Sequence, residues 1–157
     1  MILDAQHVFS DSQALTATAL STNVFDLSID RSIGNGTPMG VLFICEVAAD
    51  QGTGDEDYTF AIETASDSTI ATARQELGRR IFESGTPTAP AQNADLLVAG
   101  FQFVLPIPPA ALSETERYLG VRYTLAGTSP TITVSAHLMP LDQISNRATF
   151  ASGYTIV

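Results

Sequence analysis

Two runs of strict alternation within residues 117–139 are the clearest structural pattern in the chain. Their apolar positions are Leu119, Val121, Tyr123 and Leu125 in the first run, and Ile132, Val134, Ala136 and Leu138 in the second. Apolar residues at every second position lie on one face of a β-strand. The break at residues 126–130 reads Ala-Gly-Thr-Ser-Pro. Since this is turn material, the pattern predicts an antiparallel hairpin with one apolar face and one face in water.

The same reasoning predicts strands elsewhere in the chain. They cover residues 24–29, 40–49, 58–63, 79–83, 96–105 and 154–157. The run at residues 40–49 is apolar except for Glu46, which is typical of a central strand covered on both faces. We expect it to form a hairpin with the next strand. Residues 65–78 mix helix-favouring and strand-favouring types, so their conformation stays open, whereas the Pro-, Ala- and Thr-rich residues 84–95 predict a surface loop.

About eight strands without βαβ alternation predict an all-β protein, an antiparallel two-sheet sandwich of the jelly-roll type. Residues 1–21 have no sustained period. They favour an N-terminal arm over a short helix, followed by a single domain at residues 22–157. Within the arm, Ile2, Leu3, Val8 and Phe9 have no spacing that would dock them on their own sheet. We therefore expect these four side chains to contact another chain.

The charge balance limits the possible partners. The 157-residue chain has a net charge of −10, and it has seven basic residues, all of them arginine. Nucleic-acid binding needs a basic surface, and anionic lipid would be repelled, so neither is expected as a partner. Proteins, sugars and small molecules remain. We expect a protein folded in a cytoplasm, because the start has no basic flank and no apolar run would span a bilayer.

Few residues suggest a metal site. The acidic residues 50–57 are interpreted either as a calcium turn or as a solvated hairpin tip whose charges discourage edge pairing. The second is favoured because the ligand order of a calcium loop is missing. His7 and His137 are far apart in sequence, and Cys45, the only cysteine, lies in an apolar run. We expect Cys45 to be buried and inert and His137 to be exposed or hydrogen-bonded, with no zinc site.

A carboxylate pair is the only candidate for catalysis. Glu46 and Glu63 lie on the two strands of the second expected hairpin and would face one another. Glycosidases need such a pair roughly 5–9 Å apart, beside aromatic side chains that stack on sugar. The chain has no tryptophan, and its other aromatic residues fall mostly at core positions. Nucleophile elbows, phosphate loops and dinucleotide fingerprints are also missing, so we expect no enzyme activity.

Several segments carry a resemblance to a known family. Residues 1–4, 8–14 and 21–24, together with 117–123 and 127–131, resemble the opening and the C-terminal hairpin of capsid cement (decoration) proteins of tailed bacteriophages. Residues 65–94 match nothing in that family. The resemblance implies a jelly-roll homo-oligomer, dimer or trimer, without cofactor or enzyme activity. Such a protein is assembled in the host cytoplasm and lies on the outer capsid surface of the virion, where it clamps neighbouring subunits of the major capsid protein.

This resemblance gives the arm a role. Ile2, Leu3, Val8 and Phe9 would contact the capsid or a sister subunit, and a protein lacking residues 1–12 would stay folded but fail to attach to heads. Two other classes remain open, a carbohydrate-binding β-sandwich module and, more remotely, a jelly-roll glycoside hydrolase that uses Glu46 and Glu63.

Overall fold

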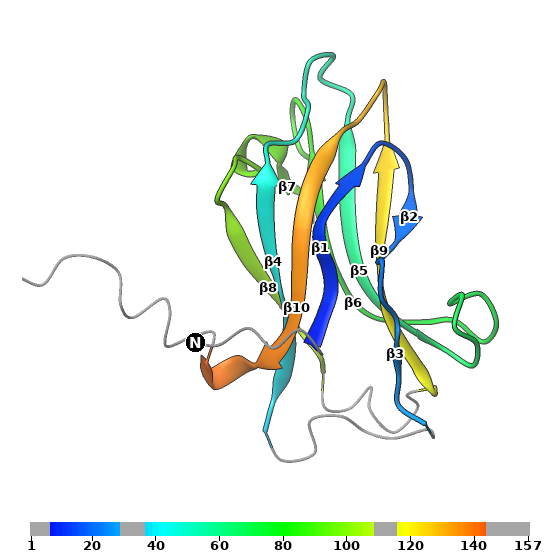
Figure 1. The fold of residues 1–157 in the computed structure, drawn as a ribbon. Helices are drawn as coiled ribbons and strands as arrows, with labels where there is room; N and C mark the ends of the chain where they lie inside the picture. The colour runs from blue at the N-terminus through cyan, green and yellow to red at the C-terminus, as the bar shows by residue number, and fades with distance from the viewer. Residues whose placement is uncertain (1–6, 29–36, 109–115, 144–157) are drawn as a thin grey trace, which may run out of the picture.

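The protein is a two-layer β-sandwich (Figure 1). The structure, a computed structural model, describes residues 7–28, 37–108 and 116–143. The strands in these residues are β1 (Val8–Leu15), β2 (Ala19–Leu20), β3 (Phe25–Asp26), β4 (Met39–Val47), β5 (Asp57–Ala65), β6 (Gln75–Glu83), β7 (Gln92–Asn93), β8 (Gln102–Pro106), β9 (Tyr118–Ala126) and β10 (Ile132–Pro140). One short 3₁₀ helix, η2 (Ala94–Leu96), follows β7. The expected all-β sandwich is confirmed.

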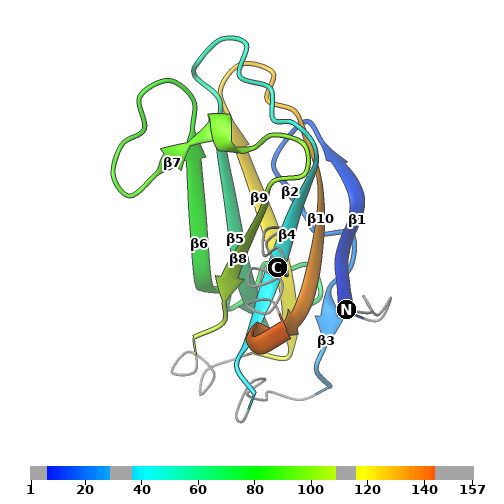
Figure 2. The ribbon, with the colours of Figure 1, turned by 90° about the vertical axis from the view of Figure 1, so that its left-hand side faces the viewer.

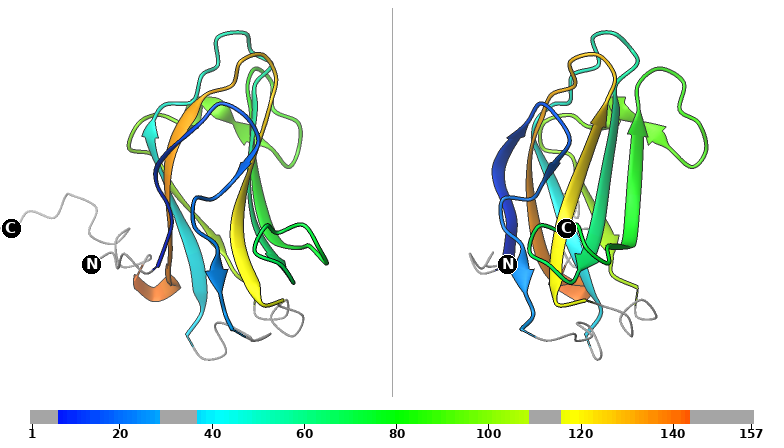
Figure 3. Two further views of the ribbon diagram at one scale, coloured as in Figure 1. Left: turned by 45° about the vertical axis from the view of Figure 1, so that its right-hand side comes forward. Right: turned by 90° about the vertical axis from the view of Figure 1, so that its right-hand side faces the viewer.

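The order of the strands is that of a jelly roll. One sheet has the order β1-β10-β4-β8, and the other has the order β2-β9-β5-β6-β7, with β3 also pairing with β9. Every pairing is antiparallel except that of β6 with β7. The chain passes from one sheet to the other at most of its connections, as Figure 2 and the left view of Figure 3 show. This alternation between two sheets is the double Greek key of jelly rolls.

Both expected hairpins are wrong, although the strands themselves are confirmed. β9 and β10 lie in different sheets, where β9 pairs with β5 and β10 pairs with β4. In the same way β4 and β5 lie in different sheets. Alternation shows that a segment is a strand with one covered face, but it does not show which strand lies beside it. Short connections that cross between sheets therefore look like hairpin turns in the sequence.

Several boundaries also differ from the expectation. The strand expected at residues 24–29 is only Phe25–Asp26, and the one expected at residues 96–105 begins at Gln102. The ambiguous residues 65–78 divide into a turn and the start of β6, which makes β6 longer than expected. The turn is held by Asp67, whose carboxylate accepts hydrogen bonds from the backbone N–H groups of Thr69 and Thr72. The strand expected at residues 154–157 lies outside the described residues.

The expected arm at residues 1–21 is wrong where the structure describes it. Residues 8–15 form β1, an edge strand that pairs with β10, and residues 19–20 form β2. The alternation of β1 is broken by two register shifts, between Val8 and Ser10 and between Ser10 and Gln13. Bulges of this kind reverse the faces of later residues, so the segment shows no sustained period in the sequence. The single domain therefore begins before residue 22.

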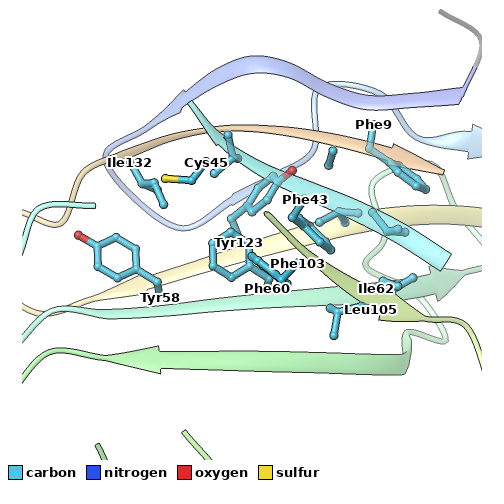
Figure 4. Packing of buried hydrophobic residues seen from close by; sticks show 14 of the residues in the cluster. Phe9, Phe43, Cys45, Tyr58, Phe60, Ile62, Phe103, Leu105, Tyr123 and Ile132 are labelled. Atoms are coloured by element: carbon cyan, nitrogen blue, oxygen red, sulfur yellow. The ribbon is translucent and has the colours of Figure 1, made fainter. Parts of the chain in front are cut away.

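Aromatic rings lie at the centre of the core between the sheets, among aliphatic side chains (Figure 4). Phe60 of β5 lies at the centre, with ring centroids 5.4 Å from Phe43, 5.1 Å from Phe103 and 5.8 Å from Tyr123. The Tyr123 hydroxyl is 2.7 Å from Ser10 Oγ, so the one polar atom of that ring is satisfied inside the core. Edge-to-face and stacked rings pack densely and hold the two sheets in fixed relation.

Candidate interaction surface

The four arm residues do not form one surface. Phe9 is fully buried in the core of its own chain, and its ring centroid lies 4.3 Å from that of Phe25. The prediction that Phe9 contacts another chain is therefore wrong. Deleting residues 1–12 would remove Phe9 from the core and part of β1 from its sheet, so we now expect the shortened chain to lose stability. Val8 remains half-buried on β1. Ile2 and Leu3 lie outside the described residues.

Glu46 and Glu63 lie in different sheets, on β4 and β5, and their carboxylates bind different partners. Glu46 is exposed and accepts a hydrogen bond of 2.8 Å from Ser135 Oγ. Glu63 is buried, and its carboxylate binds Arg122 Nε at 2.7 Å, with Arg74 at 3.7 Å on its other oxygen. Each carboxylate is thus held by neighbours of its own sheet, and the pair required for glycoside cleavage is not assembled.

The expectation that Cys45 is buried is confirmed, whereas His137, expected to be exposed or hydrogen-bonded, is not exposed. The Cys45 side chain is 2% exposed, and burial raises the pKa of its thiol to about 11, so it stays protonated and unreactive. His137 is 8% exposed, and its Nδ1 has no hydrogen-bond partner. Burial lowers the pKa of His137, which keeps the ring neutral at pH 7.

The acidic residues 50–57 form an ordered turn between β4 and β5. Glu56 is fully buried, and its carboxylate accepts hydrogen bonds from the backbone N–H groups of Thr53, Gly54 and Asp55 at 2.9, 2.9 and 3.1 Å. Hydrogen bonds from Thr53, through its hydroxyl and its backbone N–H, lower the pKa of Glu56 to about 2. The Glu56 carboxylate thus accepts hydrogen bonds from the backbone N–H groups of its own turn, and it stays ionised at neutral pH.

Hydrogen bonds join this turn to two neighbouring loops. The Asp55 carboxylate accepts from the backbone N–H of Thr128 at 3.0 Å and from its hydroxyl at 2.9 Å. The backbone N–H of Asp50 donates to the Thr131 carbonyl at 2.9 Å. On the other side, Gln51 Nε2 donates to the Ala94 carbonyl at 2.9 Å. Loops that lie far apart in the sequence thereby form one rigid end of the sandwich, which carries the loops at the top of Figure 1.

The exposed large hydrophobic residues of the described chain all lie at this end. They are Val47, Leu96 and Val98, with 58%, 43% and 53% of their surface exposed. The segments that carry them run side by side, since the Ala49 N–H donates to the Leu97 carbonyl and the Gly100 N–H donates to the Cys45 carbonyl. Because Leu97 between them is fully buried, the chain turns Leu96 and Val98 outward. We call residues 47–57, 94–98 and 127–131 the loop end.

Sequence reasoning placed residues 96–105 in one strand and did not identify Leu96 and Val98 as part of an exposed surface. A signal was present, since Asn93 and Asp95 interrupt the chain just before Leu96. Asn93 Oδ1 accepts from the Asp95 N–H at 2.8 Å and starts the 3₁₀ turn η2. This is the usual preference of Asn at the start of a helical turn.

The described residues contain no cluster of three or more His, Cys, Asp or Glu side chains placed to hold a metal ion. Nor do residues 7–28, 37–108 and 116–143 include a helix of the length and apolar character needed to cross a bilayer.

Comparison with protein-family models places the chain. The model named Bbp16 matches residues 9–138, from β1 through most of β10. The chain belongs to the Bbp16 family. That family name is phage-related, and with the β-sandwich fold it is compatible with a phage structural protein. No curated protein matches the chain.

The Bbp16 match covers the loop end as well as the core. Its residues 47–57, 94–98 and 127–131 all lie inside the matched range. This surface combines exposed aliphatic side chains, exposed carboxylates and a hydrogen-bonded backbone, which are the features of a surface for non-covalent binding. Such a surface is suited to binding another macromolecule.

Proposed function

We propose that this Bbp16-family protein is a structural virion protein that binds the outside of a phage head. It acts as a cement protein that stabilises the capsid by clamping neighbouring major capsid subunits, and it does so as a homodimer or homotrimer. The observation that carries the proposal is the match of a phage-related family to nearly the whole jelly roll. The sequence resemblance to capsid cement proteins supports the same role.

The physical properties of the chain support an external, non-enzymatic role. A net charge of −10 would repel packaged DNA, which suits a position outside the head. The only carboxylate pair considered for catalysis is separated into two sheets. Many copies bound to a repeating surface gain avidity, so each contact can be weak.

The carbohydrate-binding alternative gains no support from the aromatic residues. Sugar-binding modules stack rings on exposed aromatic platforms, whereas the exposed large hydrophobics of the described chain are Val47, Leu96 and Val98. Phe43, Phe60 and Tyr123 are all committed to the core. The proposal therefore keeps a protein surface as the partner.

Co-sedimentation tests the proposal. The full chain is mixed with undecorated heads of the phage that carries its gene, the heads are pelleted, and the bound protein is measured against total protein. We expect saturable binding and a higher temperature of head disruption. Heads of an unrelated phage are the control. Equal recovery with both kinds of head, or no recovery with either, would contradict the proposed function.

A further inference from the structure

The geometry points to the loop end as the surface that docks on the partner, through Val47, Leu96 and Val98. We infer that the partner is a protein surface with an apolar area surrounded by lysine and arginine side chains. This inference rests on the proposed function, and it specifies which end of the sandwich meets the head and what the head must present there.

The first argument is the exposed apolar area. Monomeric proteins expose single hydrophobic residues at many places, but a cluster on neighbouring segments marks an interaction site. Here every exposed large hydrophobic residue of the described chain falls in one such cluster. The three side chains are aliphatic and together resemble the apolar centre of a protein–protein interface.

The second argument is that the surface is already ordered. Asp55 and Thr128 link the turn at residues 50–57 to the connection between β9 and β10, and Gln51 links it to η2. The Tyr58 hydroxyl donates to the Asp50 carbonyl and so fastens the same turn to β5. A surface whose loops are fixed before binding loses less conformational entropy when it docks.

The charges around the apolar cluster identify the partner. Asp50 and Asp95 are exposed beside it, and Asp57 lies opposite Glu83 at the adjoining strand ends. Residues 47–57 and 83–101 contain no lysine, arginine or histidine. A basic rim on the partner would complement these carboxylates and speed association.

The same charges argue against a second copy of this chain as the occupant. In a two-fold symmetric contact, the same patch meets itself. Asp50 and Asp95 of one protomer would then face the same carboxylates of the other, and no ion pair among the described residues joins either carboxylate to an arginine. Like charges placed together across an interface cost affinity. The exposed carboxylates of the loop end therefore fit a partner of opposite charge.

Two variants of the full chain test the inference with undecorated heads. Val47→Ser/Leu96→Ser/Val98→Ser removes the apolar cluster, and we expect its affinity for heads to fall about tenfold or more. Asp50→Asn/Asp95→Asn keeps the shape and removes two charges. We expect weaker binding at low salt and a smaller loss of binding as salt rises.

The matched control is Asp11→Asn/Glu76→Gln, which removes two exposed charges away from the loop end. It should bind heads as the unchanged protein does, and all variants should show the same cooperative melting. Full binding by both loop-end variants would overturn this inference and leave the proposed function standing, whereas failure of the unchanged protein to bind would overturn the proposed function. Loss of self-association in the apolar variant would show that the occupant is a second copy, which also overturns it.

Discussion

Glu56 shows how one buried carboxylate can determine the shape of a loop. Its oxygens accept hydrogen bonds from three backbone N–H groups and from the Thr53 hydroxyl, all within residues 53–56. Its own carbonyl accepts from the Ser84 N–H at 2.9 Å, which fastens the turn to the end of β6. These hydrogen bonds stabilise the fold most when the Glu56 carboxylate is ionised, so their contribution to the free energy of unfolding depends on pH.

We expect Glu56→Gln to lower the melting temperature by several degrees at neutral pH. The glutamine amide has no charge, and its NH2 group would lie against backbone N–H groups that need an acceptor. Because the pKa of Glu56 is depressed to about 2, its stabilising effect is present above the ordinary carboxyl pKa and is lost as pH falls through about 2. Melting followed by circular dichroism at a series of pH values should show the difference shrinking below about pH 4. Glu76→Gln, at an exposed site, is the control, and a difference that does not change with pH would contradict the assignment.

Gly127 is required by both conformation and space. It has φ +94°, a region that other residues rarely adopt, and a Cβ built there would lie 2.3 Å from the Asp55 carbonyl oxygen. The backbone of the β9–β10 connection therefore touches the backbone of the acidic turn. The two loops approach this closely only because position 127 has no side chain.

We expect Gly127→Ala to destabilise the fold by about 2 kcal/mol or more, because strain in φ and the contact with Asp55 add together. Gly100→Ala is the matched control. Gly100 also has a positive φ, +86°, but no atom lies within 4 Å of a Cβ built there, so it measures the conformational strain alone. Chemical denaturation of both variants should show the larger loss at position 127. Equal losses would mean that the loops move apart without cost.

At the scale of the strands, the sequence predicted where strands lie along the chain better than it predicted which strands pair with one another. β9 and β10 were expected because their inward residues repeat every second position, and that repeat depends only on one covered face. Their separation into two sheets depends on β4 and β5, which lie more than fifty residues earlier in the chain. A local pattern contains no information on such distant neighbours. Residues 8–15 were predicted to belong to an arm because the bulges of β1 interrupt its alternation, and because its partner β10 is distant in the sequence.

The inward faces of β9 and β10 give a direct test. Leu119 is fully buried and Val134 is 2% exposed, and they lie in opposite sheets facing one core. We expect Leu119→Asp and Val134→Asp each to cost about 4 kcal/mol or more, enough to unfold a domain of ordinary stability. Thr124→Asp, at an exposed position of β9, is the control and should melt like the unchanged protein. A soluble Leu119→Asp variant with cooperative melting would mean that the face is reversed.

At the scale of the molecule, the sandwich presents two different outer surfaces. All arginines in the described residues are on or next to β6 and β9 of one sheet, namely Arg74, Arg79, Arg80, Arg117 and Arg122. The outer row across the other sheet runs through Val8, His137, Leu42 and Val104, which pair in register from β1 to β8. This second surface has no described arginine. Of the row, only Val8 and Val104 are partly exposed, because His137 and Leu42 are buried.

We expect the protein to be a dimer or trimer in solution, and two valines on the outer side of the sheet that contains β4 supply the reason. Val8 and Val104 are half-buried there, so a second copy would cover them and complete the layer. Light scattering at micromolar concentration measures the mass directly. A monomer would remove self-association from the proposed function.

The candidate surface was less predictable than the fold. The acidic residues 50–57 were visible in the sequence, and their preferred interpretation as a hairpin tip failed only because β4 and β5 do not form a hairpin. The apolar half of the loop end was hidden, since Leu96 and Val98 look like strand residues until Asn93 and Asp95 turn the chain. Exposure of a side chain depends on what covers it, and this is decided by the tertiary structure.

The place of β10 between β1 and β4 has a consequence for how the protein is made. The sheet that contains them cannot close until the ribosome has delivered residues 132–140, because β10 supplies the pairing edge for both neighbours. Pairings between such distant segments form slowly. Until β10 is made, β1 has no partner in its sheet, whereas β4 can pair only with β8. A chain that ends prematurely before β10 would leave β1 and β4 without their common neighbour. We therefore expect chains that end before residue 132 to lack the sheet formed by β1, β10, β4 and β8.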